Sequence, residues 1–208
     1  MQESRSVYLF GYSGHAYVVI ESLMAAGYEI KGYFDIVQAK NNPYHLAYLG
    51  DEKQADIKAI VKDQLVFPCV GDNSVRKRLI ELFDTQQLKQ FVAIDPSALV
   101  SQTASIQPST YIGKGVALNA QAVIGKGVIL NTLSIVEHEC NIGNYVHIAP
   151  NAVLCGNVSV GENSFIGSNA VVRQSIRISA GNLIGAGSVV TANIEENGVW
   201  VGNKLRKL

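Results

Sequence analysis

The fold is decided by the stretch from residue 112 to residue 130, which reads IGKGVALNAQAVIGKGVIL. An aliphatic side chain recurs at every sixth position, and the register continues in both directions. A period of six fits neither the 3.6-residue repeat of an α-helix nor the alternation of a strand, and it is typical of a parallel β-helix built from hexapeptides. The 16 aliphatic positions are Val100, Ile106, Ile112, Leu118, Ile124, Leu130, Val136, Ile142, Ile148, Leu154, Val160, Ile166, Val172, Ile178, Ile184 and Val190.

The hexads share two further features. A small or β-branched residue stands four places after most aliphatic positions, as at Ala104 and Thr110, with Asn182 as a polar exception. A glycine or asparagine often follows the aliphatic residue directly, as at Gly113 and Asn119. We predict that the aliphatic side chains fill the prism, that the small residues fill its corners and that glycine or asparagine eases the turns. Residues 98–208 are therefore expected to form about five regular coils of a left-handed β-helix.

Residues 1–97 have a different pattern and predict a small α/β domain. Short apolar runs alternate with amphipathic segments in a βαβαβ order, which is typical of a Rossmann-like parallel sheet with helices on its faces. The expected strands are 7–10, 30–34, 65–70 and about 91–94, and the expected helices follow Gly11–His15 and cover about 56–62 and 74–83.

Composition excludes several classes of partner. Lysine plus arginine and aspartate plus glutamate both number 17, so the net charge is zero and nucleic acid is not an expected partner. Charged residues make up 16% of the chain, below the roughly 25% of typical domains, which favours an oligomer with hidden surface. No apolar run approaches the roughly 18 residues of a membrane span, and the N-terminus has no apolar leader, so we expect a cytoplasmic protein without a membrane partner.

No metal site is expected. Cys69, Cys140 and Cys155 show no CxxC spacing and stand among apolar residues, as structural thiols do. His138 and His147 are half a coil apart, on the order of 15 Å, and cannot share a metal within one chain. A metal hydratase of the γ-carbonic anhydrase type, which needs three histidine ligands, is a distant alternative.

Three polar turns of the α/β domain form a candidate ligand site. Gly11–His15, Asp35 and Gly71–Asn73 each follow an expected strand, and the carboxyl ends of parallel strands gather at one edge of the sheet. Gly11-x-x-Gly14 at a helix start can present N–H groups to a phosphate, although such turns are as often structural. Arg76, Lys77 and Arg78 begin the next helix, where either a nearby diphosphate or a solvated basic face would explain them.

His138 is the candidate catalytic residue. It stands between Glu137 and Glu139, two places after the inward Val136, which is a corner of the prism. A histidine near neutral pH can accept a proton, and an adjacent carboxylate can fix its tautomer and stabilise the imidazolium. An ordinary surface histidine is the alternative, and a β-helix that serves only as a scaffold or an ice-binding surface is the alternative for the whole repeat.

Taken over its whole length, the chain resembles the hexapeptide-repeat acyltransferases that carry a nucleotide-sugar-binding α/β domain ahead of the β-helix. Within that family it is most similar to the UDP-4-amino-sugar N-acetyltransferases of the bacillosamine pathway of glycan biosynthesis. Sialic acid O-acetyltransferases and perosamine N-acetyltransferases are relatives. The motifs that carry the likeness are Gly11–His15, Asp35, Val70–Asn73, Asn131-Thr132, Val136–Cys140 and the pair Gly156-Asn157.

The resemblance implies roles for individual residues. His138 would be the catalytic base and Glu139 the carboxylate that raises its basicity. The acetyl-CoA site, in a groove between subunits of a homotrimer, would be lined by His147, Gly156, Ser168 and Ala186. The nucleotide sugar would be bound by Ser13, Gly14, His15, Asp35, Gly71 and Asn73. Transfer would be direct, with Cys140 as packing material rather than a nucleophile.

The expected activity is acetyl-CoA-dependent N-acetylation of a UDP-linked 4-amino-4,6-dideoxy sugar, with no metal. O-acetylation of sialic acid or another sugar, N-acetylation of GDP-perosamine and a sugar-nucleotide-binding module without turnover remain alternatives. Relatives commonly end in a Gly-x-Pro-Ala-Lys-like turn that this chain lacks. Lys204, Arg206 and Lys207 could therefore meet coenzyme phosphates or form a solvated tail.

Overall fold

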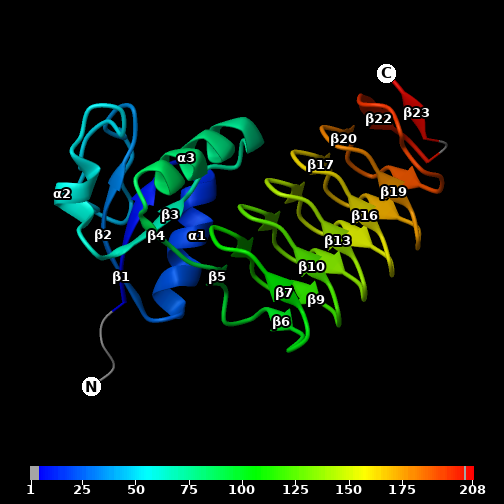
Figure 1. The fold of residues 1–208 in the computed structure, drawn as a ribbon, viewed down its shortest axis with the longest axis horizontal. Coiled ribbons are helices and arrows are strands. Elements are labelled where there is room, and N and C mark those ends of the chain that lie inside the picture. The colour runs from blue at the N-terminus through cyan, green and yellow to red at the C-terminus, as the bar shows by residue number, and fades with distance from the viewer. Residues whose placement is uncertain (1–4, 204) are drawn as a thin grey trace.

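The computed structural model describes residues 5–203 and 205–208 and contains an α/β domain followed by a β-helix (Figure 1). The α/β domain has a parallel sheet, as the sequence predicts, and its strands lie in the order β2-β1-β3-β4. Its helices lie on the faces of that sheet. The elements are β1 (Arg5–Phe10), α1 (Gly14–Ala25), β2 (Tyr28–Phe34), α2 (Ile57–Val61), β3 (Leu65–Pro68), α3 (Asn73–Thr85) and β4 (Lys89–Gln90).

The left-handed β-helix has about six turns, and its strands form three parallel sheets named here by their outer faces. The docked sheet, which meets the α/β domain, contains β5 (Ala93–Ile94), β8 (Tyr111–Ile112), β11 (Ile129–Leu130), β14 (His147–Ile148), β17 (Phe165–Ile166), β20 (Leu183–Ile184), β22 (Val199–Val201) and the antiparallel β23 (Arg206–Lys207). The aliphatic sheet contains β6 (Leu99–Val100), β9 (Ala117–Leu118), β12 (Ile135–Val136), β15 (Val153–Leu154), β18 (Val171–Val172) and β21 (Val189–Val190). The polar sheet contains β7 (Ser105–Ile106), β10 (Val123–Ile124), β13 (Asn141–Ile142), β16 (Ser159–Val160) and β19 (Arg177–Ile178).

The β-helix begins earlier than the sequence predicts. The expected last strand of the α/β domain, about 91–94, is instead β5, which pairs with β8 of the β-helix, whereas β4 completes the α/β sheet. The expectation of about five coils is therefore one too low. Ile94 continues the hexad register one step before Val100, so this strand belongs to the repeat.

The inward hexad positions form one continuous core inside the prism, in which Ile124, Ile148 and Ile166 are fully buried. The polar exception, Asn182, is also buried, but its side chain is satisfied. Its Nδ2 donates to the Ser179 carbonyl, and its Oδ1 accepts a hydrogen bond from Trp200 Nε1 at 2.9 Å. The exception is tolerated because a buried amide with partners avoids the cost of desolvation.

The predicted role of the glycines at the corners is wrong in one respect. Left-handed backbone occurs at the third position after the aliphatic residue, as at Gly115 and Glu139, and not at the first. The glycine at the first position serves close stacking instead. A Cβ on Gly161 would lie 2.4 Å from the backbone nitrogen of Ala180 in the next coil, so a side chain cannot fit there.

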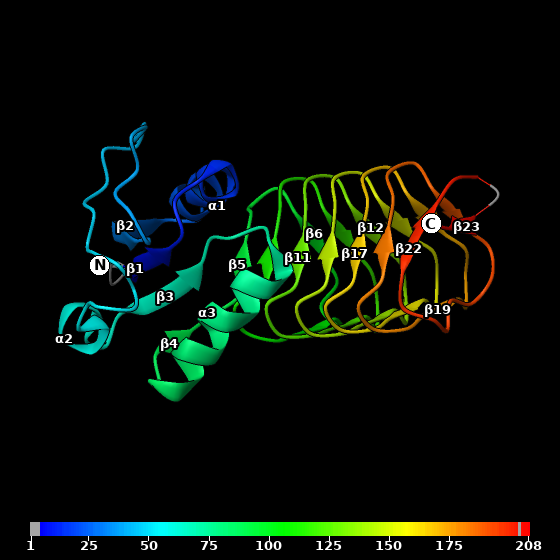
Figure 2. The same ribbon diagram turned by 90° about the horizontal axis from the view of Figure 1, so that it is seen from above.

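The α/β domain docks at the N-terminal end of the prism, with α1 and α3 next to the first coils (Figures 1 and 2). Ser22 of α1 donates to Asp95 at 2.5 Å and lies 2.8 Å from the Tyr111 hydroxyl, and Ile80 of α3 packs against Tyr145. These buried contacts fix the carboxyl edge of the α/β sheet against the outer face of the docked sheet.

Candidate active site

His138 lies at the corner between the aliphatic sheet and the polar sheet, in the turn from β12 to β13. Glu139 has left-handed backbone with φ 60°, and its N–H donates to the Ala120 carbonyl of the preceding coil at 2.9 Å. The corner directs both side chains outward, and each is about 60% exposed. His138 Nδ1 and Glu139 Oε2 are 2.9 Å apart, so Nδ1–H donates a hydrogen bond to the carboxylate and Nε2 is left as the basic nitrogen.

Gly156, at the same corner one coil later, makes room for the His138 ring. A Cβ on Gly156 would lie 2.6 Å from both Cε1 and Nε2 of His138. The carbonyl of His138 accepts from Asn157 N–H at 2.8 Å, which ties the two coils together. Within the described part of the chain, the N–H of Gly156 donates to no acceptor. A basic nitrogen and a free amide donor thus stand side by side.

Cys140 follows the same corner but faces the core. Its Sγ lies 3.2 Å from the Cys155 carbonyl, to which the thiol donates, and burial raises the pKa of this thiol to about 11. A protonated, buried thiol is a poor nucleophile. These contacts agree with a packing role.

The predicted sugar-binding turns meet at the carboxyl edge of the α/β sheet. The Asp35 carboxylate links two of these turns. It accepts one hydrogen bond from Tyr12 N–H, at 2.9 Å, and another from Ile36 N–H, at 2.8 Å. Ser13 and Gly14 are exposed at the start of α1, where the Ser13 side chain makes no capping bond. The first N–H groups of this helix therefore remain available to an anion.

His15 and His147 come together between the two domains, although 132 sequence positions separate them. Their ring centroids are 6.3 Å apart. Burial, reinforced by the positive charge of Arg76, lowers the pKa of His15 to about 4 and that of His147 to about 3. Both rings are therefore neutral near pH 7. His15 Nε2 is buried without a hydrogen-bond partner in the described structure.

His147 does not offer a free ring nitrogen to a coenzyme. It is 8% exposed, its Nδ1 lies 3.2 Å from the Gly71 carbonyl, and its Nε2 lies 3.2 Å from Asn131 Nδ2. In this chain the His147 ring is part of the domain interface, and its contact with acetyl-CoA stays a prediction.

Asn73 and Arg76 hold the two domains together. Asn73 Nδ2 donates to the carbonyls of Asn163 and Ser164, and its Oδ1 accepts from Arg76 Nη2 at 2.9 Å. The Asn73 side chain is thus occupied by contacts between the domains, and its role in sugar binding stays a prediction.

The expected basic cluster at the start of α3 does not exist as one surface. Arg76 is 1% exposed and fully engaged, Lys77 lies 5.4 Å from the centre of the Tyr145 ring, and Arg78 pairs with Glu52 at 3.0 Å. Both explanations offered for the three cations, a diphosphate and a solvated face, are therefore wrong for Arg76.

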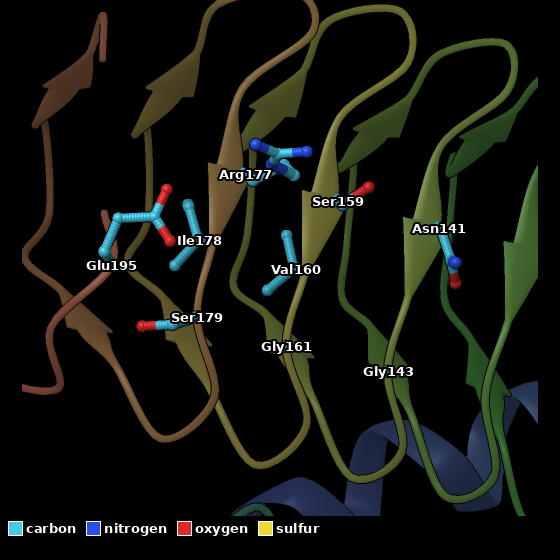
Figure 3. Close-up of a pocket in the computed structure, with 9 residues that line it drawn as sticks. All are labelled: Asn141, Gly143, Ser159, Val160, Gly161, Arg177, Ile178, Ser179 and Glu195. Carbon is cyan, nitrogen blue, oxygen red and sulfur yellow. The ribbon is translucent and has the colours of Figure 1, made fainter. Parts of the chain in front are cut away.

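Two hollows adjoin these residues. One, of about 330 Å³, lies between Gly71–Ser74 and the docked sheet, where it reaches Phe165 and Leu183. Neither apolar residue was predicted from the sequence, although both occupy outward strand positions just beyond the coils that the α/β domain covers. The other, of about 390 Å³, runs along the polar sheet from Asn141, next to the His138 corner, to Arg177 and Glu195 (Figure 3).

One chain does not bring all predicted site residues together. His138, Glu139 and Gly156 lie at the corner between the aliphatic and polar sheets. Ser168 and Ala186 lie at the corner between the docked and aliphatic sheets. The two corners are the opposite edges of the aliphatic sheet, separated by six residues or up to about 20 Å of extended chain.

The C-terminal cations, a metal site and a membrane-spanning helix were also considered from the sequence. Lys207 pairs with Glu196 at 2.9 Å and lies 5.8 Å from the centre of the Trp200 ring, Arg206 is exposed, and Lys204 lies outside the described residues. Among residues 5–203 and 205–208, no group of three histidine, cysteine or acidic side chains could hold a metal. Nor does any described helix have the length and apolar character needed to cross a membrane.

Comparison with known proteins agrees with this architecture. Residues 6–83 match the PglD N-terminal domain, residues 139–174 the bacterial transferase hexapeptide and residues 157–192 the hexapeptide repeat of succinyl-transferase. A mutant perosamine N-acetyltransferase from Caulobacter crescentus, solved with CoA and GDP-perosamine, is 31% identical with a TM-score of 0.92, and the match covers 98% of this chain and 96% of that one. The chain belongs to the hexapeptide-repeat sugar acetyltransferases with a PglD-type N-terminal domain.

Two further solved structures share this arrangement of domains. The acetyltransferase domain of PglB from Neisseria gonorrhoeae FA1090, solved with acetyl coenzyme A, is 30% identical with a TM-score of 0.92 over 99% of this chain and 100% of that one. WeeI from Acinetobacter baumannii AYE shares the fold, at 20% identity and a TM-score of 0.81 over 97% of this chain and 99% of that one.

We predict that acid lowers the stability of the interface between the α/β domain and the β-helix, where His15 and His147 are buried. Both histidine pKa values lie below the ordinary 6.5, so the unfolded chain binds protons that the folded chain does not. The stabilisation is complete above about pH 6.5 and is lost as the pH falls toward 4, by up to about 1.4 kcal/mol per pH unit for each histidine. Urea unfolding between pH 7 and pH 4.5 measures this slope.

His15→Phe removes one of the two titrating rings and leaves no unpartnered nitrogen. The free energy of unfolding of this variant should therefore depend less steeply on pH, by the equivalent of about one proton taken up on unfolding. His45→Asn is the matched control, because His45 is exposed and its left-handed backbone suits asparagine. Equal slopes for His15→Phe and the wild type would contradict the prediction.

Proposed function

We propose that the chain transfers the acetyl group of acetyl-CoA to the 4-amino group of a UDP-linked 4-amino-4,6-dideoxy-N-acetyl-hexosamine, a bacillosamine-type sugar used in glycan biosynthesis. The observation that carries the proposal is the exposed His138–Glu139 pair, whose basic nitrogen faces Gly156. The relative solved with CoA and GDP-perosamine supports amine rather than hydroxyl acetylation. We also propose that the protein acts in the cytoplasm and binds neither nucleic acid nor a membrane.

In this proposal His138 is the general base. Nε2 takes the proton of the amine while the nitrogen attacks the thioester carbonyl, and Glu139 stabilises the imidazolium that forms. The free N–H of Gly156 donates to the developing oxyanion. When the C–S bond breaks, His138 returns the proton to the departing thiolate, so the products are the amide and the free thiol, without an acyl-enzyme.

The α/β domain would bind the nucleotide sugar at the carboxyl edge of its sheet. The first turn of α1, at Ser13 and Gly14, offers N–H groups to the diphosphate. His15, Asp35 and Gly71 would shape the same edge, next to the hollow that Phe165 lines.

The outer face of the aliphatic sheet supports a homotrimer. Its outward residues are all aliphatic, and Leu99 is 73% exposed. In the chain alone this stripe has no cover, which is typical of an interaction surface. The outward residues are Leu99, Ala117, Ile135, Val153, Val171 and Val189.

A threefold axis facing the aliphatic sheet would complete the site. Each chain would place its His138 corner beside the other corner of its neighbour, where Ser168 and Ala186 lie, through a head-to-tail contact that closes into a ring. The coenzyme would then lie between subunits, with Gly156 from one chain and Ser168 and Ala186 from the next.

Thiol release from acetyl-CoA tests the activity. We expect turnover with UDP-4-amino-4,6-dideoxy-N-acetylglucosamine that exceeds turnover with GDP-perosamine or sialic acid. His138→Ala should lower the rate by about 10²- to 10⁴-fold, because general base catalysis contributes that much. Turnover with sialic acid alone would move the function to O-acetylation, and an unchanged rate in His138→Ala would contradict the mechanism.

Gly156→Ala tests the geometry of the corner. Its methyl group would displace the exposed His138 ring, so we expect the acetylation rate to fall by about 10²-fold. The free energy of unfolding should change by less than about 1 kcal/mol, because the ring is free to swing into solvent. Gln102→Ala, at the same hexad position three coils earlier, is the control. A Gly156→Ala enzyme with the wild-type rate would refute this account of the corner.

A further inference from the structure

Arg76 is a buried cation that no described carboxylate contacts directly, although the negative charge of Asp72 acts on it at longer range. The Arg76 side chain is 1% exposed, and none of the described carboxylates makes an ion pair with it. Desolvation of a guanidinium is costly unless every N–H finds an acceptor. Replacement of such a group by an apolar side chain is often neutral or stabilising, so packing alone does not explain an arginine at this position.

All five N–H groups of Arg76 are used, and their acceptors come from both domains. Nε donates to the Gly127 carbonyl at 2.7 Å, and Nη2 donates to the Tyr145 carbonyl at 2.9 Å, both on the β-helix. Nη1 donates to the carbonyls of Val70 and Gly71, and Nη2 donates to Asn73 Oδ1. The guanidinium therefore sets the position of the β3–α3 turn relative to two coils, and no N–H remains for a phosphate.

The Gly71 carbonyl extends this network to His147. It accepts from Arg76 Nη1 at 3.0 Å and from His147 Nδ1 at 3.2 Å. A carbonyl only accepts, so His147 must carry its proton on Nδ1, and Nε2 of the neutral ring is an acceptor. Asn131 Nδ2 donates to that Nε2 at 3.2 Å.

The network ends on the amide of Asn131 at the edge of the aliphatic sheet. Asn131 Oδ1 accepts from Thr132 N–H at 2.8 Å, and its Nδ2 is held by His147, so the orientation of the amide is determined at both ends. In the proposed trimer this edge faces the His138 corner of the neighbouring chain.

We infer that Arg76 is a positioning residue for acetyl transfer, which orients Asn131 beside the neighbour's catalytic base through the Gly71 carbonyl and His147. The inference rests on the proposed function for its kinetic consequence but not for the hydrogen-bond relay itself. In this inference the α/β domain does more than bind substrate, because its docking on the β-helix also orients a residue of the active site.

A double-mutant cycle with Arg76→Met and Asn131→Ala tests the kinetic consequence. Each single variant should lower kcat by roughly tenfold or more, because misorientation by about 1 Å has effects of this size. If Arg76 acts through Asn131, Arg76→Met should lower kcat little further in the Asn131→Ala background. Multiplicative losses would overturn the inference. Arg78→Met, which removes an arginine from the same helix but outside the relay, should keep kcat within about twofold of the wild type.

Nitrogen-15 NMR of the histidines tests the relay without any turnover. The wild type should show His147 protonated on Nδ1, and Arg76→Met should show a mixture of tautomers, with Arg76→Lys intermediate. Retention of the pure Nδ1–H form in a folded Arg76→Met protein would overturn the relay even if the enzyme is active. If no acceptor supports turnover in the wild type, the proposed function fails, whereas the NMR result still decides the relay.

Discussion

The stacking of one coil on the next is the constraint on which the rest of the structure depends. Each backbone N–H of a strand finds its carbonyl one coil away, so residues 18 positions apart are locked in the same column. The hexad register decides which side chains enter the prism and which leave at a corner. The active-site geometry follows from the same columns, because Gly156 lies beside the His138 ring only through the 18-residue offset.

The prism also explains why the candidate site is divided. A triangular cross-section places each corner at the end of a flat sheet, so the proposed catalytic and coenzyme-lining residues that lie on different corners cannot meet within a single chain. The α/β domain covers the first coils of the docked sheet, and the outward residues of the polar sheet are mostly hydrophilic, so the aliphatic sheet is the surface best suited to association. Assembly is thus a condition for activity in this account.

Much of the fold could be predicted from the sequence, because the hexad period is a direct consequence of coil geometry. The first strand was missed because Ala93-Ile94 also fits the end of an α/β domain, and only pairing with β8 decides between the two. The buried position of Arg76 could have been predicted from helical spacing, because Arg76 shares the buried face of α3 with Leu79, Ile80 and Phe83. It was not predicted because a charged side chain is normally assigned to the surface. The contact between His15 and His147 could not be predicted, because it depends on how two domains dock.

An intersubunit complementation experiment tests the shared site most directly. His138→Ala chains lack the base, and Ala186→Trp chains would have the opposite, coenzyme-lining corner blocked, so each homotrimer should be inactive. In trimers formed from an equal mixture, a site needs one intact corner from each of two neighbours, each with a probability of about one half, so about a quarter of the wild-type activity should return. Mixed trimers with no activity above that of the separate variants would contradict the account.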